Sequence, residues 1–138
     1  MQKSDRGSLS LMVVVLFAVL AAMAGIVVDG SAKLTGDENA AAVAQEAARA
    51  GATSVDTSRA YSTGTFAVDP QQAVMAARSY LSTAGYRQYT VVAVGADAIR
   101  VTVSTTVPTR FLSLIGIDSF TCTGTAVASL VTGVTGPS

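Results

Sequence analysis

The sequence predicts an α+β fold made of a long N-terminal membrane helix, a second helix and a small antiparallel sheet of three or four strands. Three observations predict it: an uncharged apolar run near the N-terminus, alanine-rich segments with helical spacing, and alternating apolar and polar residues in the last third of the chain. Outside the apolar run roughly 110 residues remain, which is enough for one small domain with its own core.

The apolar run extends from Ser8 to Val28 and contains no charged residue. A helix rises about 1.5 Å per residue, so this run would be roughly 31 Å long, close to the roughly 30 Å hydrocarbon thickness of a bilayer. A helix satisfies its own backbone hydrogen bonds, as lipid requires. We therefore expect a transmembrane helix over residues 8–28, with the lipid bilayer as its partner.

The charges on either side of the run indicate its direction. Lys3 and Arg6 precede it, and Lys33 is the basic residue that follows it closely. Basic residues favour the cytoplasmic side, so residues 1–7 are expected to be a cytoplasmic N-terminal segment of a single-pass protein. Residues 29–132 would then form an extracytoplasmic domain.

A competing interpretation is a cleaved signal peptide. Residues 22–24 (Ala-Met-Ala) have the small-x-small pattern of a signal peptidase site, and release near Ala24 would give a secreted small binding domain. However, the run is long for a signal peptide and continues past this site over residues 26–28. For these two reasons we favour an uncleaved signal anchor.

The helical pattern continues beyond the apolar run. Gly30 and Gly36 each cost about 1 kcal/mol relative to Ala, so the helix either runs on or breaks near them. Gly51 is expected to be the C-cap, and residues 52–68 to be a loop with a short strand around residues 61–68. Alanine-rich positions recur at helical spacing: Ala40, Val43, Ala44, Ala47 and Ala48.

A second helix begins with a recognisable cap. Asp69 is suited to the N-cap, Pro70 to the first helical position, and Gln72 completes a pattern like a capping box. Gly85 is expected to close the helix. Its predicted apolar stripe consists of Ala73, Ala77, Tyr80, Leu81 and Ala84.

The period then changes to the alternation of strands. Residues 89–94 and 99–107 are predicted to form an antiparallel hairpin, which Pro108 ends. A third strand over residues 119–130 carries small residues that would let a helix approach the sheet: Gly124, Ala126 and Ala128. Residues 133–138 are expected to be a flexible tail. The residues of the second strand expected to share the inner face are Ile99, Val101, Val103, Thr105 and Val107.

The chain lacks the residue patterns of common enzymes and nucleic-acid binders. It has no histidine, which excludes the usual catalytic triads and most zinc sites, and it has no phosphate-binding or dinucleotide-binding glycine motif. Its net charge is zero and its basic residues are scattered, so no basic surface for nucleic acid is evident. We expect no enzyme activity, no cofactor and no small-molecule substrate. Four carboxylates, expected to be solvated charges on a helix surface, are Asp29, Asp37, Glu38 and Glu46.

Three further features are candidates for contacts. Cys122 is the only cysteine and is expected to be a small buried residue, the alternatives being an intermolecular disulfide or palmitoylation. Residues 110–117 (RFLSLIGI) are apolar and join two strands; we favour a place in the core, and exposure would instead make them a contact patch for a partner subunit or the membrane surface. The contact residues would be Phe111, Leu112, Leu114 and Ile115. Small-xxx-small pairs that could pack another membrane helix are Ala18/Ala22 and Ala21/Gly25.

Several short segments together resemble a known family. They are residues 6–8 (RGS), 27–30 (VVDG), 45–52 (QEAARAGA), 107–112 (VPTRFL) and the small-residue final strand. In this combination the chain resembles the TadE/TadG-like proteins of the Flp, or tight-adherence, pilus system, especially those of actinobacteria. The resemblance covers most of the chain.

The resemblance implies a pilin-like domain in a minor-pilin-like or pseudopilin accessory protein of a bacterial cytoplasmic membrane, whose partners are other pilus-assembly subunits. In this family a prepilin peptidase can cut after a glycine that precedes the apolar helix, and the matching residues are Gly7 and Ser8. Pilin-like relatives often have Glu at the fifth mature position, followed by an aromatic residue, where this chain has Met12 and Val13. A Glu in lipid is kept to pair with a neighbouring subunit, so its absence favours an accessory role over a place in a filament shaft.

Overall fold

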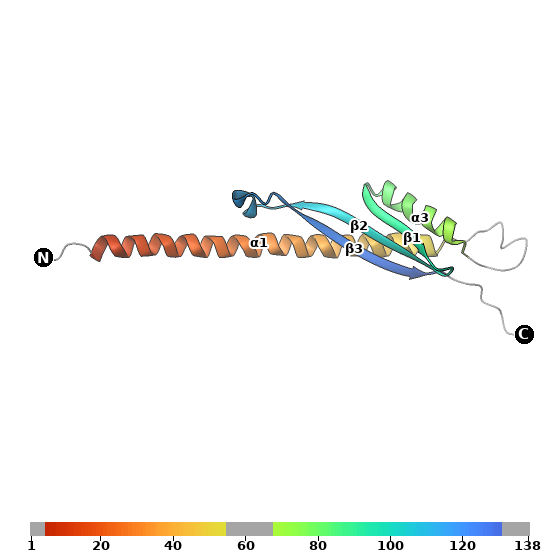
Figure 1. Ribbon diagram of the computed structural model, residues 1–138, viewed down its shortest axis with the longest axis horizontal. Helices are drawn as coiled ribbons and strands as arrows, with labels where there is room; N and C mark the ends of the chain where they lie inside the picture. Colours follow the sequence, from red (N-terminus) through yellow and green to blue (C-terminus); the bar gives the residue numbers. More distant parts are fainter. Residues whose placement is uncertain (1–4, 55–67, 131–138) are drawn as a thin grey trace, which may run out of the picture.

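The computed structural model describes residues 5–54 and 68–130 of the chain. Figure 1 shows a helical rod whose N-terminal half extends alone and whose outer half lies along a small sheet and a second helix. This confirms the predicted α+β class. The elements in order are α1 (Asp5–Ala52), α3 (Pro70–Thr83), β1 (Gln88–Val94), β2 (Ala98–Pro108), the 3-10 turn η1 (Leu112–Ile115) and β3 (Ser119–Ser129).

The sheet has three antiparallel strands in the order β1-β2-β3. Val101 of β2 pairs with Val91 on one side and with Ala126 on the other, which fixes the register of the inner face. The predicted strands begin and end within about one residue of these bounds, because their alternation has the period of a half-buried sheet. The inner face packs against α1 and α3 and supplies much of the core: Val91, Ile99, Val101, Val103 and Ala126.

Helix α1 is continuous for 48 residues and passes through Gly30 and Gly36 without a break. Small residues on one side of α1 let the sheet approach closely. A Cβ atom at Gly36 would lie 2.5 Å from the Cys122 Sγ atom, and one at Gly124 of β3 would overlap the backbone of Ala41. The contact between helix and strand therefore requires glycine on both sides.

Gly51 differs from its predicted role. It lies inside α1, which ends at Ala52, and a Cβ atom there would lie 2.5 Å from the Ile99 Cδ1 atom. Glycine is needed at this position because the sheet comes close, and not because the helix ends there.

Helix α3 begins as predicted, with the Asp69 carboxylate accepting a hydrogen bond from the amide of Gln71 at 2.8 Å. Gly85 follows the helix in the left-handed region, at φ 86°, where glycine is favoured. Tyr80 differs from the predicted stripe, because 40% of it is exposed. Ala84 is exposed as well, and the buried side of α3 consists of Ala73, Ala77 and Leu81.

Two predicted features fall where the structure gives no description. The tail over residues 133–138 lies outside the described residues. So does the short strand expected around residues 61–68, apart from Val68, which is buried and belongs to no strand.

Candidate functional site

Asp29 and the start of the loop between β2 and β3 form a buried polar contact at the end of the apolar run. The Asp29 Oδ1 atom accepts a hydrogen bond from the amide of Arg110 at 2.9 Å. Its Oδ2 atom accepts from the amides of Phe111 and Leu112, at 2.9 and 2.7 Å. Only 1% of Asp29 is exposed, so this carboxylate is bound almost entirely by backbone donors of a distant segment.

These amides keep the carboxylate ionised. Burial of Asp29 would raise its pKa, but the hydrogen bonds from Leu112, Arg110 and Phe111 together outweigh burial and hold the pKa below its ordinary value. At the start of a tight turn, amides have no carbonyl partner within the turn. The Asp29 carboxylate accepts their hydrogen bonds instead, as an N-cap side chain does at the start of a helix. The expected role of Asp29 as a solvated surface charge is therefore wrong.

The loop that Asp29 holds is closed at its base and folded on itself. The Thr109 amide donates to the Asp118 carbonyl at 3.0 Å, and the Thr109 hydroxyl donates to the Ile117 carbonyl. The turn η1 ends at Gly116, whose φ of 89° lies in the left-handed region. We call residues 110–117 the η1 loop.

The apolar side chains of the η1 loop are largely exposed. Leu114 is 84% exposed, Ile115 72% and Phe111 47%. The predicted place of this segment in the core is therefore wrong. Figure 1 shows the physical reason, because the loop extends beyond the end of the sheet and lies beside α1.

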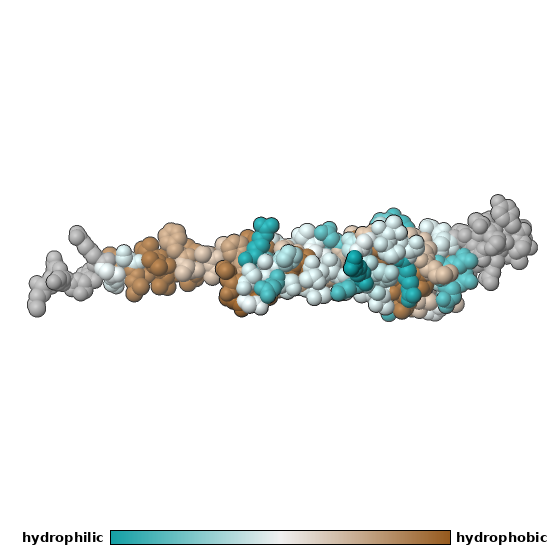
Figure 2. All heavy atoms as spheres, turned by 90° about the horizontal axis from the view of Figure 1, so that it is seen from above, coloured by the Kyte–Doolittle hydropathy of each residue, from teal (hydrophilic) through white to brown (hydrophobic). Residues whose placement is uncertain are grey.

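An apolar groove of about 450 Å³ lies between α1 and the η1 loop. Phe111 is packed so close to α1 that a Cβ atom at Gly25 would lie 2.8 Å from the Phe111 Cβ atom. Figure 2 shows apolar surface along the N-terminal half of the molecule and again at the near end of the domain. The groove is lined by Ala21, Ala22, Gly25, Ile26, Phe111, Leu112, Leu114 and Ile115.

The groove brings together two sets of residues that the sequence analysis treated separately. All four predicted contact residues of the loop line it, as do Ala21, Ala22 and Gly25 from the predicted helix-packing set. Ala18 is exposed on the adjoining part of α1 and does not line it. Gly7 and Ser8 lie in the first turn of α1, far before Ala21, where the groove begins, and both are exposed.

A second polar contact joins α1 to the outer edge of β3. The Lys33 Nζ atom lies 2.9 Å from the Asp37 Oδ2 atom and also donates to the Thr121 carbonyl at 3.3 Å. The Asp37 Oδ1 atom accepts from the Thr123 amide at 3.1 Å. Side chains of α1 thus occupy backbone groups that an edge strand would otherwise offer to another chain.

The same contact shifts the titration of its members. The hydrogen bond between them raises the pKa of Lys33 and lowers that of Asp37. Cys122 lies beside them, fully buried as predicted, with its Sγ atom 3.6 Å from the Lys33 carbonyl oxygen. Burial raises the pKa of this thiol, which makes it a poor nucleophile.

Residues 24–128 of the chain match the model of the Tad-like Flp pilus-assembly family, Tad_C. The chain belongs to this family. No curated protein and no solved structure matches it. The matched range begins beside Gly25 and contains Asp29, the η1 loop, α3 and nearly all of the sheet.

In this Tad-like protein, α1 is the helix among the described residues that is long and apolar enough to cross a membrane, and it lies near the N-terminus. Most of its apolar part has no cover from the rest of the protein. The family match and this helix together fit an accessory protein of pilus assembly.

The described part of this Tad-like protein contains no group of three or more His, Cys, Asp or Glu side chains that could hold a metal ion. Asp37 is half-buried and paired, which corrects its expected role as a solvated charge, while Glu38 and Glu46 are exposed as expected.

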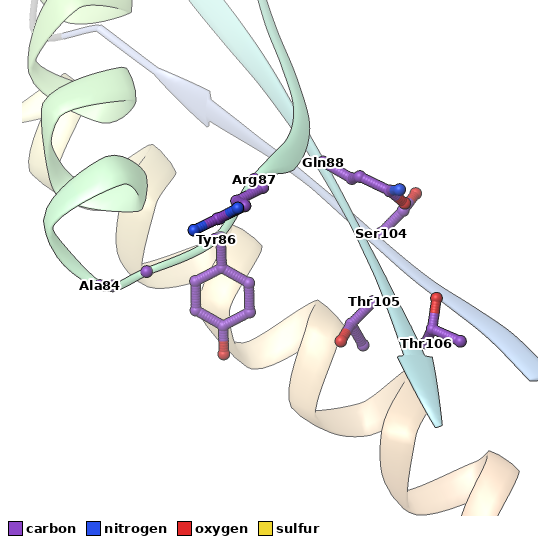
Figure 3. Close-up of a pocket in the computed structure, with 8 residues that line it drawn as sticks. Ala84, Tyr86, Arg87, Gln88, Ser104, Thr105 and Thr106 are labelled. Carbon is purple, nitrogen blue, oxygen red and sulfur yellow. The ribbon is translucent and has the colours of Figure 1, made fainter. Parts of the chain in front are cut away.

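A polar hollow of about 290 Å³ lies where α3 leads into β1. Figure 3 shows Gln88 and Ser104, which pair across β1 and β2, with their side chains close together at this hollow. Arg87 is the charged residue of its lining, which includes no carboxylate, thiol or imidazole.

Sequence reasoning missed the role of Asp29. The local signal is an acidic residue directly after the apolar run. This position is equally typical of a solvated charge, so the signal alone does not identify a buried contact. Its partners are more than 80 residues away in the sequence, so only the tertiary structure identifies them.

Proposed function

We propose that this chain is a membrane-anchored accessory protein of Flp-type pilus assembly, of the pseudopilin or minor-pilin-like kind, which acts through contacts with other pilus subunits. The observation that carries the proposal is the continuity of α1, which joins a run of membrane-spanning length to a domain of the Tad-like family without an intervening linker. Its N-terminus would lie in the cytoplasm and its domain outside, in agreement with the charge bias across the run.

The membrane helix is the surface through which we expect subunit contact. Ala18 and Ala22 are small, exposed and four residues apart, which allows close approach of a second helix. Ala21 and Gly25 are the less accessible pair, since Phe111 already packs on Gly25. A neighbouring membrane helix would therefore dock on the Ala18/Ala22 part of the stripe.

Gly7 fits a processing site better than a packing site. A Cβ atom there would meet no atom within 4 Å, so the fold gives no reason for glycine at this position. We propose that a prepilin peptidase cleaves between Gly7 and Ser8, and that Met12 and Val13 keep the product out of a filament shaft.

The mass of the protein isolated from its native membrane tests the anchor. Cleavage after Gly7, or no cleavage, agrees with an anchored protein, and only the first agrees with the processing proposal. Cleavage near Ala24 would instead release the secreted domain and overturn the anchored function.

Co-purification tests the pilus role. The chain, extracted from membranes with mild detergent, should bring down other Flp pilus-assembly subunits, and Ala18→Leu/Ala22→Leu should weaken this without loss of the protein. Met75→Leu, at an exposed site on α3, is the matched control. Equal recovery of subunits with both variants would contradict the helix contact, and recovery of none with the wild type would contradict the function.

A further inference from the structure

We propose that the η1 loop is seated in the outer leaflet of the membrane, so that the protein contacts the bilayer at two places, α1 and this loop. The proposal rests on the anchoring of the chain by residues 8–28. The occupant around the exposed apolar side chains of the loop is then lipid hydrocarbon.

The first argument is depth. The loop packs beside Ala21, Ala22, Gly25 and Ile26, which belong to the last two turns of the apolar run. From Ala21 to Val28 the helix rises roughly 10 Å, so the groove lies within the outer third of the spanning segment. Any membrane position that covers the whole run also covers the part of the loop that packs on it.

The second argument is the distribution of charge on the loop. Arg110 and Asp118 stand at its base, and no charged residue lies between them in the sequence. The exposed tip carries Leu114 and Ile115, at 84% and 72% exposure. An apolar tip with charges at its base is the arrangement expected of a segment that enters the boundary between headgroups and acyl chains.

The third argument is the satisfaction of the backbone. Within the loop, the amides of Leu114, Gly116 and Ile117 donate to carbonyls of the same loop. The amides of its first three residues donate to Asp29, which in turn has its charge compensated by them. Irregular backbone at membrane depth requires such internal partners, and Asp29 supplies the acceptors for the first three amides of the loop.

A consequence is that the domain is restricted in height and tilt relative to the membrane. A single helix can slide along the membrane normal and tilt in a bilayer. With a second apolar contact beside α1, either movement would draw the loop out of the lipid, so both are opposed.

Single-tryptophan variants test the proposal, because the chain contains no tryptophan. The full chain carrying Leu114→Trp is reconstituted into phosphatidylcholine vesicles, with and without bromines on the acyl chains. We expect a blue-shifted emission that brominated lipid quenches, most strongly when the bromines are near the headgroups. Leu114 is mostly exposed, so tryptophan fits there without disturbing the core.

Two further variants separate the possible outcomes. Phe17→Trp, at an exposed site in the apolar run, reports insertion of α1, and Val127→Trp, 57% exposed on the open face of the sheet, reports a site outside the membrane. Quenching of Phe17→Trp and Leu114→Trp, but not of Val127→Trp, supports the proposal.

The remaining outcomes contradict it. Quenching of Phe17→Trp alone would show that α1 is inserted and the loop is not, which overturns the inference and leaves the anchor. A blue-shifted Leu114→Trp that lipid bromines do not quench would mean that protein covers the loop. No quenching of Phe17→Trp would overturn the anchor itself, and with it the proposed function.

Discussion

Asp29 and Leu112 are 83 positions apart in the chain, and a hydrogen bond of 2.7 Å joins the Leu112 amide to the Asp29 Oδ2 atom. This bond, with those from Arg110 and Phe111, attaches the far end of the sheet to the point where the apolar run of α1 ends. It is the contact on which the position of the η1 loop depends.

Replacement of this carboxylate should loosen the loop. Asp29→Asn keeps the size of the side chain but replaces one acceptor oxygen by an amide group, which would face the backbone donors. We expect faster hydrogen exchange at the amides of residues 110–112 in micelles, with little change in α3. Glu46→Gln, an exposed carboxylate on the same helix, is the matched control. Unchanged exchange in Asp29→Asn would contradict a structural role for the bond.

The pH dependence of stability should report the hydrogen bonds of Asp29 and Asp37. The pKa values of Asp29 and Asp37 are lowered in the folded protein, so both groups stabilise it fully above the unfolded value, about 3.9. That contribution is lost as the pH falls below this value and through the folded pKa. The melting temperature of the wild type should therefore fall more steeply below about pH 4 than that of Asp29→Asn/Asp37→Asn. Parallel curves would show that the hydrogen bonds do not favour the charged forms.

Two glycines of α1 should respond in opposite directions to the same substitution. Gly36→Ala places a methyl group against Cys122 and Val107, and we expect a loss of about 1–3 kcal/mol from overpacking. Gly30→Ala meets no atom within 4 Å and should gain up to roughly 1 kcal/mol from helix propensity. Thermal unfolding of both variants in the same detergent measures the difference. Equal effects would indicate that α1 does not approach β3 as described.

Cys122 should be protected from thiol reagents. It is fully buried and its pKa is raised, so labelling by a maleimide should be slow in the folded protein and complete after unfolding. Thr125→Cys in a Cys122→Ala background places the thiol at an exposed site of the same strand and should react at once. Rapid reaction of the wild type would favour the alternatives of an intermolecular disulfide or palmitoylation.

A charge in the middle of the apolar run should impair insertion. Leu16→Arg costs about 2.5–3.5 kcal/mol on scales derived from translocon insertion, and we expect part of the protein to leave the membrane fraction. Met75→Arg, at a similarly exposed site of α3, should fractionate as the wild type does. Retention of Leu16→Arg in the membrane with its domain outside would count against the run as the anchor once snorkelling of the new arginine and bilayer defects are excluded.

Local patterns predicted most of the fold. The alternation from Ile99 to Val107 is enough to assign the inner face of β2, and the Asp69-Pro70 pair is enough to begin α3, because each signal lies within a few residues. The sequence leaves the continuity of α1 open. The helix-propensity cost of Gly36 is evident from the local sequence, whereas the close approach of Cys122, which explains the glycine, depends on the tertiary structure. Tyr80 has the spacing of the buried stripe of α3, but it lies at the edge of the packed surface and is therefore exposed.

The candidate site could be predicted only in part. The sequence marked Phe111 and Leu114 as apolar residues needing an explanation, and the small residues around Gly25 as a close-packing surface. The sequence could not show that the loop and these small residues of α1 meet, because their contact depends on where the sheet ends along α1. The burial of Asp29 depends on the same relation between distant segments.

The unbroken course of α1 makes it a rigid support for the domain and not a flexible tether. From Val28 to Ala52 it rises roughly 36 Å with no joint, so the domain cannot be lowered, raised or swung like one on a flexible stalk. In the proposed anchored state, a subunit bound at the distal end of α1 would lie that far from the bilayer. A force applied there would be transmitted along the helix to the segment in the lipid.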